Sequence, residues 1–236
     1  MKKSACLFAF FISVAFNIYS QSVYVGGVFP TIDHSGSISK QIDYGLYYFG
    51  AFPLLHLKQP DFRNDPTLML LYTEQGLTYK VNSAFSLNAS YVYQRENVLK
   101  DNYLNENRIH IQATFKQSVS LLNLKHRIRL DNRFIQNRIT GKSPYTHRLR
   151  YLFGIDFPLK QKPSNFYFTA YEEAFFNTHT NATAIYGENW AYAALGLQLN
   201  EQHKIETGPL YTTWNNGHKT WFHQFYLQIT WISHFR

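Results

Sequence analysis

The sequence predicts an all-β protein: a single antiparallel transmembrane β-barrel of about ten strands, with roughly eight to twelve compatible with the pattern. Three observations favour this fold class. Apolar and polar residues alternate with a period of two over most of the chain, and the predicted strands are longer than those of globular proteins. Aromatic residues make up 18% of the chain, whereas charged residues make up only 16%. Aromatic rings gather at membrane interfaces, so this composition suits a protein that lipid partly surrounds.

The beginning of the chain reads as a secretory signal peptide. Lys2 and Lys3 form a positive start, an apolar run follows at 5–16, and cleavage is expected after Ser20. No later run approaches the roughly 18 uninterrupted apolar residues of a transmembrane helix. Export without an anchoring helix leaves three classes: a periplasmic protein, a secreted protein or an outer-membrane barrel.

We therefore divide the chain into a signal peptide at 1–20, an N-terminal lead-in at 21–39 and an outer-membrane barrel at 40–236. The segment 22–32 is compatible with a further strand as well as with a lead-in, and both alternatives stay open. Within the barrel, strands are expected at 40–49, 67–80, 84–95, 105–118, 124–137, 145–157, 165–177, 187–199, 203–214 and 222–235. Strands of globular proteins average about five or six residues, whereas a tilted strand needs about 9–11 residues to cross a bilayer.

The predicted links between strands alternate in length. Links such as 81–83 and 121–123 are tight, whereas 50–66 and 96–104 are longer and more polar. Outer-membrane barrels have short periplasmic turns and longer outer loops, so this alternation favours the same fold class. It also predicts an even number of strands, with both ends of the barrel on the periplasmic side.

The stretch "HRIRLDNRF" at 126–134 shows what the two faces of a strand carry. Arg127, Arg129, Asp131 and Arg133 fall on one face, and apolar residues fall on the other. An arginine that faced mid-membrane hydrocarbon would cost about 2–4 kcal/mol, so we expect the charged face to line a lumen. The alternative is a soluble sheet with one solvent-exposed face. The strand length and the high aromatic content weigh against it.

Several of these segments are similar to a bacterial family called domain of unknown function 2490, especially to members from Bacteroidetes-type bacteria. The likeness covers roughly residues 40–235 and is carried by "NENRIHIQ", "HRIRLDNRF", "YTHRLRYLFGIDFPL", "YEEAFFN" and "GENWAYAALGLQL". The resemblance implies a barrel in the outer membrane of a Gram-negative bacterium and no assigned activity. The last strand also resembles the signal that the barrel-assembly machinery reads, although Arg236 follows the aromatic Phe235.

We expect the inward charges to form one internal network, because buried charges need partners and arginine pairs with carboxylates through two bonds. The expected role is structural, or binding through the outer loops, with lipid and the assembly machinery as partners. The predicted lumen-lining residues are Glu106, Arg108, Arg127, Arg129, Asp131, Arg133, Arg148, Arg150, Asp156 and Glu173.

Two other hypotheses remain. Arginines outnumber acids on three neighbouring predicted strands, which would suit a narrow channel that prefers small anionic solutes. A hydrolase is the second, because Ser143 lies close to His147 in the sequence, but no nucleophile motif accompanies them. We expect no enzyme activity, no catalytic residue and no cofactor. We also expect no metal, because no zinc motif occurs, and no nucleic-acid partner, because the basic residues alternate within strands.

Overall fold

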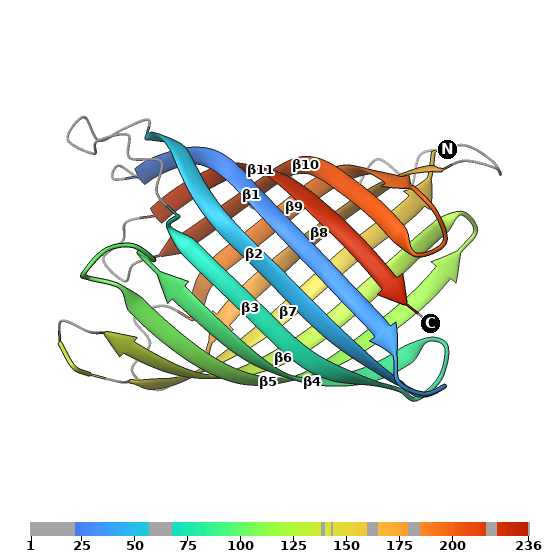
Figure 1. Cartoon of the computed structure of the whole chain (residues 1–236), viewed down its shortest axis with the longest axis horizontal. Coiled ribbons are helices and arrows are strands. Elements are labelled where there is room, and N and C mark those ends of the chain that lie inside the picture. Colours follow the sequence, from blue (N-terminus) through green and yellow to red (C-terminus); the bar gives the residue numbers. More distant parts are fainter. Residues whose placement is uncertain are drawn as a thin grey trace.

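The computed structural model describes residues 22–56, 68–137, 140–142, 144–159, 165–178, 185–215 and 221–235. In this part of the chain the strands form one closed barrel (Figure 1). The prediction of an all-β barrel is therefore confirmed. The predicted signal peptide, Ser143 and Arg236 lie outside the described residues.

The barrel has eleven strands, each of 11–16 residues. That length matches the prediction of strands about twice as long as those of globular proteins. In chain order they are β1 (Ser22–Ser37), β2 (Ile42–His56), β3 (Leu70–Lys80), β4 (Phe85–Glu96), β5 (Leu104–Val119), β6 (Leu122–Asn137), β7 (Tyr145–Pro158), β8 (Phe166–Asn177), β9 (Tyr186–Gln198), β10 (His203–Asn215) and β11 (Trp221–Phe235).

The barrel closes through a parallel pair. Each strand from β2 to β11 pairs antiparallel with its sequence neighbours, but β1 runs parallel to β11, from Ser22 opposite Trp221 to Gly36 opposite Phe235. The expectation of an even, wholly antiparallel barrel is thus wrong, and the barrel begins at Ser22 and not near residue 40. Residues 22–37 are not a lead-in, because their backbone groups pair with β11 on one side and β2 on the other.

An odd strand count places the two ends of the barrel wall at opposite rims. β1 begins at the rim that carries the links 57–69, 97–103 and 138–144, and β11 ends at the rim that carries the short links 38–41 and 120–121. Figure 1 shows β1 and β11 running side by side, with the C-terminus at the short-link rim. The prediction that both ends lie on the same side is therefore wrong.

The tight turns have side-chain support. The Oδ1 atom of Asn82 accepts hydrogen bonds of 2.8 Å from the backbone N–H groups of Ala84 and Phe85. Asn200 does the same for Gln202 and His203, at 2.9 Å each. Asparagine favours such turns because its side chain replaces a backbone acceptor.

One irregularity occurs near the start of the barrel. The register between β1 and β2 shifts at Gly26 and Gly27, which marks a β-bulge. A Cβ atom on Gly27 would lie 2.1 Å from the backbone oxygen of Phe52. Only glycine lets the two backbones approach this closely at the bulge.

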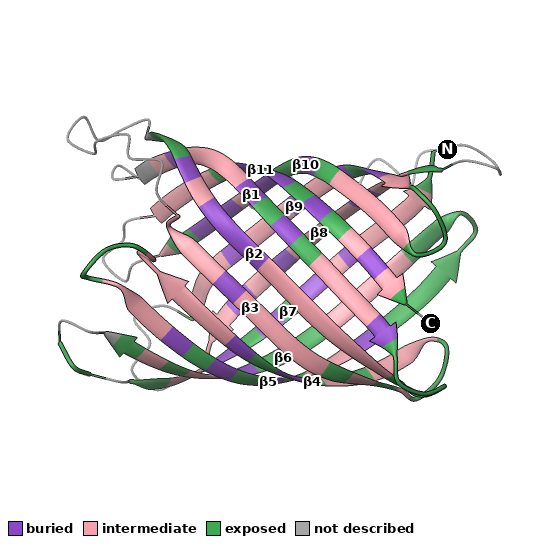
Figure 2. Ribbon diagram, viewed as in Figure 1, coloured by how far each residue is buried: buried purple, intermediate pink, exposed green. Residues whose placement is uncertain are grey.

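Buried and exposed residues alternate along the strands (Figure 2). On β6, the inward Arg129 and Asp131 are buried, whereas the outward Ile128 and Leu130 are 54% and 37% exposed. This arrangement is the reverse of a soluble protein, in which charges face water and apolar side chains fill the core.

The apolar core lies inside the barrel, on the wall opposite the charges. Phe29, Phe49 and Tyr72 from β1, β2 and β3 form a stack with ring-centroid separations of 4.6 and 4.4 Å. Trp190 from β9 meets the rings of Phe29 and Phe49 edge-on at 5.9 and 6.0 Å. Since β10, β11 and β1 separate β9 from β2 in the barrel wall, the contact of Trp190 with Phe49 reaches across part of the lumen.

Candidate functional site: the charged interior

The inward face of four adjacent strands, β5 to β8, carries a dense network of arginines and carboxylates. All ten residues predicted to line the lumen lie on this face: two on β5, four on β6, three on β7 and one on β8. They converge because inward positions recur at every second residue and the strands are hydrogen-bonded in register.

Glu106 holds two arginines at one end of the network. Arg133 donates to both of its oxygens, at 2.8 and 2.7 Å, in the two-bond geometry that fits a guanidinium to a carboxylate. The Nε atom of Arg108 donates to the same carboxylate at 2.7 Å. Glu106 and Arg108 are 4% and 2% exposed, so the pairing compensates for the loss of solvent around three charges.

Asp131 lies at the centre of the network and is fully buried. Its Oδ2 atom accepts hydrogen bonds of 3.2 and 3.1 Å from Arg148. The guanidinium groups of Arg108 and Arg150 lie 3.5 and 3.8 Å from the same oxygen. One carboxylate thus balances arginines from two neighbouring strands.

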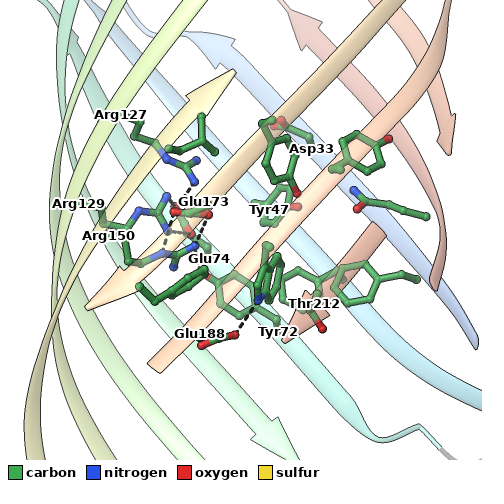
Figure 3. A pocket seen from close by; sticks show the side chains of 18 of the residues that line it. Asp33, Tyr47, Tyr72, Glu74, Arg127, Arg129, Arg150, Glu173, Glu188 and Thr212 are labelled. Carbon is green, nitrogen blue, oxygen red and sulfur yellow. Dashed lines mark hydrogen bonds and ion pairs between the residues drawn. The ribbon is translucent and has the colours of Figure 1, made fainter. Parts of the chain in front are cut away.

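Glu173 closes the other end of the network. Arg150 donates to its two oxygens at 2.8 Å each, and the Nη2 atom of Arg127 lies 2.8 Å from Oε1 (Figure 3). The ring of Phe175 packs beneath Arg150 and Arg148, whose Cζ atoms lie 4.3 and 4.8 Å from its centroid. These cation–π contacts help to hold the two guanidinium groups against the wall.

The ten residues predicted to line the lumen include neither Glu74 nor Glu188. Arg129 lies 3.2 Å from Glu74 of β3, and Arg148 lies 2.9 Å from Glu188 of β9. Glu74 also accepts a hydrogen bond of 2.6 Å from the hydroxyl of Tyr72. The signal that points to Glu74 is its inward position in the alternating pattern of β3, but its partner on β6 follows only from the closed barrel.

Asp156 is the predicted residue that stands apart. It lines the cavity near Lys125, and it makes no ion pair with a described residue. The network itself joins six arginines to five carboxylates within the described part of the chain.

A cavity of about 910 Å³ lies between the charged wall and the aromatic wall. Residues near both rims line it, including Asn97 and Asn215 at the long-link rim and Asp33 and Asp156 at the other. Within the described ranges, seven cationic and seven acidic side chains line this cavity. The surplus of arginine seen on neighbouring strands is therefore balanced, because acids from β1, β3, β4, β9 and β10 also point inward.

Residues 58–223 match a family model described as a protein of unknown function, DUF2490. The chain belongs to the DUF2490 family. This confirms the resemblance that the sequence motifs carry. The DUF2490 match covers β3 to β10. The charge network occupies β3 and β5 to β9, so it lies within the part of the chain that defines the family.

No curated protein and no solved structure shows a significant match to this DUF2490 chain. Among the described residues, no group of three or more His, Cys, Asp or Glu side chains is arranged to hold a metal ion. Across the same ranges, no helix is long and apolar enough to cross a membrane.

The histidine that suggested a hydrolase lies on the outward face of the DUF2490 barrel. The Nδ1 atom of His147 lies 3.0 Å from Oδ1 of Asn132, and Ser143 is outside the described residues. Among the described residues, the shortest serine–histidine contact is one that sequence reasoning missed: Ser233 Oγ and His34 Nδ1 lie 2.7 Å apart across the parallel β1–β11 pair. Ser233 is only 6% exposed, which leaves little room for a substrate at its hydroxyl.

Proposed function

We propose that this DUF2490 protein is an integral barrel of the bacterial outer membrane, exported through a signal peptide and inserted by the barrel-assembly machinery. One observation carries the proposal: large apolar side chains cover the outside of the barrel while the charges lie inside. Along β11, the outward Phe225, Leu227, Ile229 and Trp231 are each 48–50% exposed.

The same outward pattern continues on the far side of the barrel. On β5, Ile109, Ile111 and Phe115 are 55%, 59% and 44% exposed. Soluble monomers rarely expose apolar patches of more than a few hundred Å². A closed barrel also leaves no strand edge unpaired, which is what a β structure needs in hydrocarbon.

Glu172 on β8 departs from the outward apolar pattern. It lies on the outer face between the inward Tyr171 and Glu173, and it accepts a hydrogen bond of 3.1 Å from Asn189. One carboxylate with a hydrogen-bonding neighbour is tolerable, since acidic residues on the lipid face of a barrel cost less than arginine or lysine.

We assign the long-link rim to the outer surface and the short-link rim to the periplasm, as in other outer-membrane barrels. The proposed role is non-enzymatic. Paired charges stabilise a narrow interior, and the longer outer loops supply surface for binding.

A narrow channel is the second proposal, supported by the cavity that residues near both rims line. Because cations and acids balance in its lining, such a channel would discriminate weakly between anions and cations. Planar-bilayer recordings test this. Strongly anion-selective unit currents would support the hypothesis of an anion channel. Reconstituted protein that carries no current would contradict the channel proposal.

The membrane proposal is tested by cell fractionation and by gel mobility. The protein is expected in the outer-membrane fraction after washing with alkaline carbonate. Detergent-folded protein should migrate differently before and after boiling, because a closed barrel binds less detergent than the unfolded chain. Carbonate-soluble protein that folds without detergent would overturn the proposal.

Hydrolysis is tested separately with a phospholipid and a casein substrate. Folded wild-type protein and a His34→Ala variant are both expected to be inactive. If the wild-type protein hydrolyses either substrate and the His34→Ala variant does not, the non-enzymatic role is contradicted.

A further inference from the structure

Part of the cavity wall carries charges that the ion-pair network engages only partly or not at all. We call the following set the cross-lumen site: Asp33, Tyr47, Lys125, Arg127 and Tyr171, all of which line the cavity. Asp33 on β1 is directly opposite Tyr47 on β2 in the antiparallel register. Lys125 and Arg127 are successive inward positions of β6.

The two halves of the cross-lumen site belong to opposite walls. Four strands separate β1 from β6 in one direction, and five separate them in the other. Asp33 is nevertheless within electrostatic range of both Lys125 and Arg127. Figure 3 shows Asp33 and Tyr47 facing Arg127 from the other side of the cavity. A carboxylate and two cations therefore face one another across open space.

These charges differ from the rest of the interior in what they bind. Neither Asp33 nor Lys125 makes a hydrogen bond or ion pair through its side chain with any described residue. Arg127 pairs with Glu173 through Nη2, but its buried Nε atom has no acceptor. By contrast, Glu106 and Glu173 each bind two arginines. Asp33, Lys125 and Arg127 are half-buried and only partly partnered, so this part of the cavity is complementary to a charged ligand.

The two tyrosines add flat apolar surface beside the charges. Tyr47 packs edge-on against Tyr72 at 6.1 Å, and Tyr171 lies 5.2 Å from Tyr192. Gly154 lies opposite Lys125 on one side and opposite Tyr171 on the other. Because Gly154 has no side chain, it leaves space in the cavity between these two residues. Tyrosine faces attract cations as well as apolar groups.

We propose that the cross-lumen site binds a small zwitterion, of the chemical class of a free α-amino acid. Its ammonium group would pair with Asp33 and lie against the ring of Tyr47, and its carboxylate would pair with Lys125 and the Nε–H of Arg127. Because the lining is neutral overall, a simple anion or cation gains little from the cavity as a whole. A molecule that carries both charges is matched at both walls. The cavity volume lies in the range of small-molecule pockets, about 300–1,000 Å³.

The test is calorimetric titration of the detergent-folded full chain with three probes that share the leucine side chain. L-leucine carries both charges, L-leucinamide carries only the ammonium group, and N-acetyl-L-leucine carries only the carboxylate. Leucine is expected to bind about tenfold more tightly than either derivative, since each loses one charge-assisted contact. Maltose serves as an uncharged comparison.

Two variants assign the two charges. Asp33→Asn should reduce the affinity for leucine about tenfold and leave that for N-acetyl-L-leucine unchanged, and Lys125→Gln should spare L-leucinamide instead. The matched controls, Asp101→Asn and Lys100→Gln, change exposed residues outside the cavity and should have no effect.

Three results would overturn the proposal. They are absence of leucine binding to folded protein, equal affinity for the three leucine probes, and an unchanged preference for leucine over its derivatives in both Asp33→Asn and Lys125→Gln. Boiled and unboiled gel mobility shows that each variant is folded. The titration does not depend on membrane location, so its failure would leave the membrane proposal standing.

Discussion

Arg129 of β6 and Glu74 of β3 form an ion pair of 3.2 Å although β4 and β5 lie between their strands in the barrel wall. The long arginine side chain bridges this distance along the curved inner surface, where Gln112 also accepts from it at 2.9 and 2.7 Å. The pair therefore ties together strands that share no backbone hydrogen bonds.

Removing one member of this pair should destabilise the barrel strongly. Glu74→Gln leaves Arg129 without its carboxylate, and breaking a buried pair on one side costs about 3–5 kcal/mol. Urea unfolding of the protein in lipid vesicles, followed by tryptophan fluorescence, measures the free energy of unfolding. Glu201→Gln in an exposed turn is the matched control and should leave stability unchanged. An equally small effect for both variants would mean that the pair contributes nothing.

Placing an arginine on the outer surface should impair insertion into lipid. Leu130→Arg puts a guanidinium on the outward face of β6, at a cost of about 2–4 kcal/mol if it lies at mid-membrane depth. The fraction of protein that becomes heat-modifiable in vesicles measures this. Leu121→Arg, in the turn between β5 and β6, should insert like wild type. Normal insertion of Leu130→Arg would contradict the membrane proposal.

The parallel closure predicts an unusual topology in cells. An epitope tag inserted just before Ser22 should be accessible to antibody on intact cells, because β1 begins at the long-link rim. A tag after Arg236 should become accessible only when the outer membrane is permeabilised. A tag in the 97–103 loop marks the outer surface as a control. If that loop is labelled and the tag before Ser22 is not, the topology is wrong and the membrane assignment survives.

Side-chain contacts support the parallel β1–β11 pair near the short-link rim. His34 bonds to Ser233 at 2.7 Å, and Ser35 bonds to His234 at 3.0 Å. Loss of the first contact in Ser233→Ala should reduce stability by about 1 kcal/mol, the usual net value of a hydrogen bond. Urea unfolding measures this change. Ser83→Ala, which removes a hydroxyl from the exposed turn before β4, is the control. Equal stability of the two variants would show that the His34–Ser233 contact does not strengthen the closure.

The sequence by itself determined the class of fold, the approximate strand positions and the face on which each charge lies. Local alternation is sufficient for this, because the side-chain period of a strand is two and "HRIRLDNRF" can bury only one of its faces. The inward placement of Arg129 and Asp131 followed directly from that pattern.

Only the tertiary structure decided how the barrel closes and which charges meet. Residues 22–37 alternate like any other strand, and their place beside β11 depends on backbone hydrogen bonds with a segment almost a whole chain away. The pairing of Arg129 with Glu74, and the balance of charge around the cavity, depend on the curvature that brings non-adjacent strands face to face. The two-residue period predicts which way each side chain points, but it does not predict which residues lie on the opposite wall.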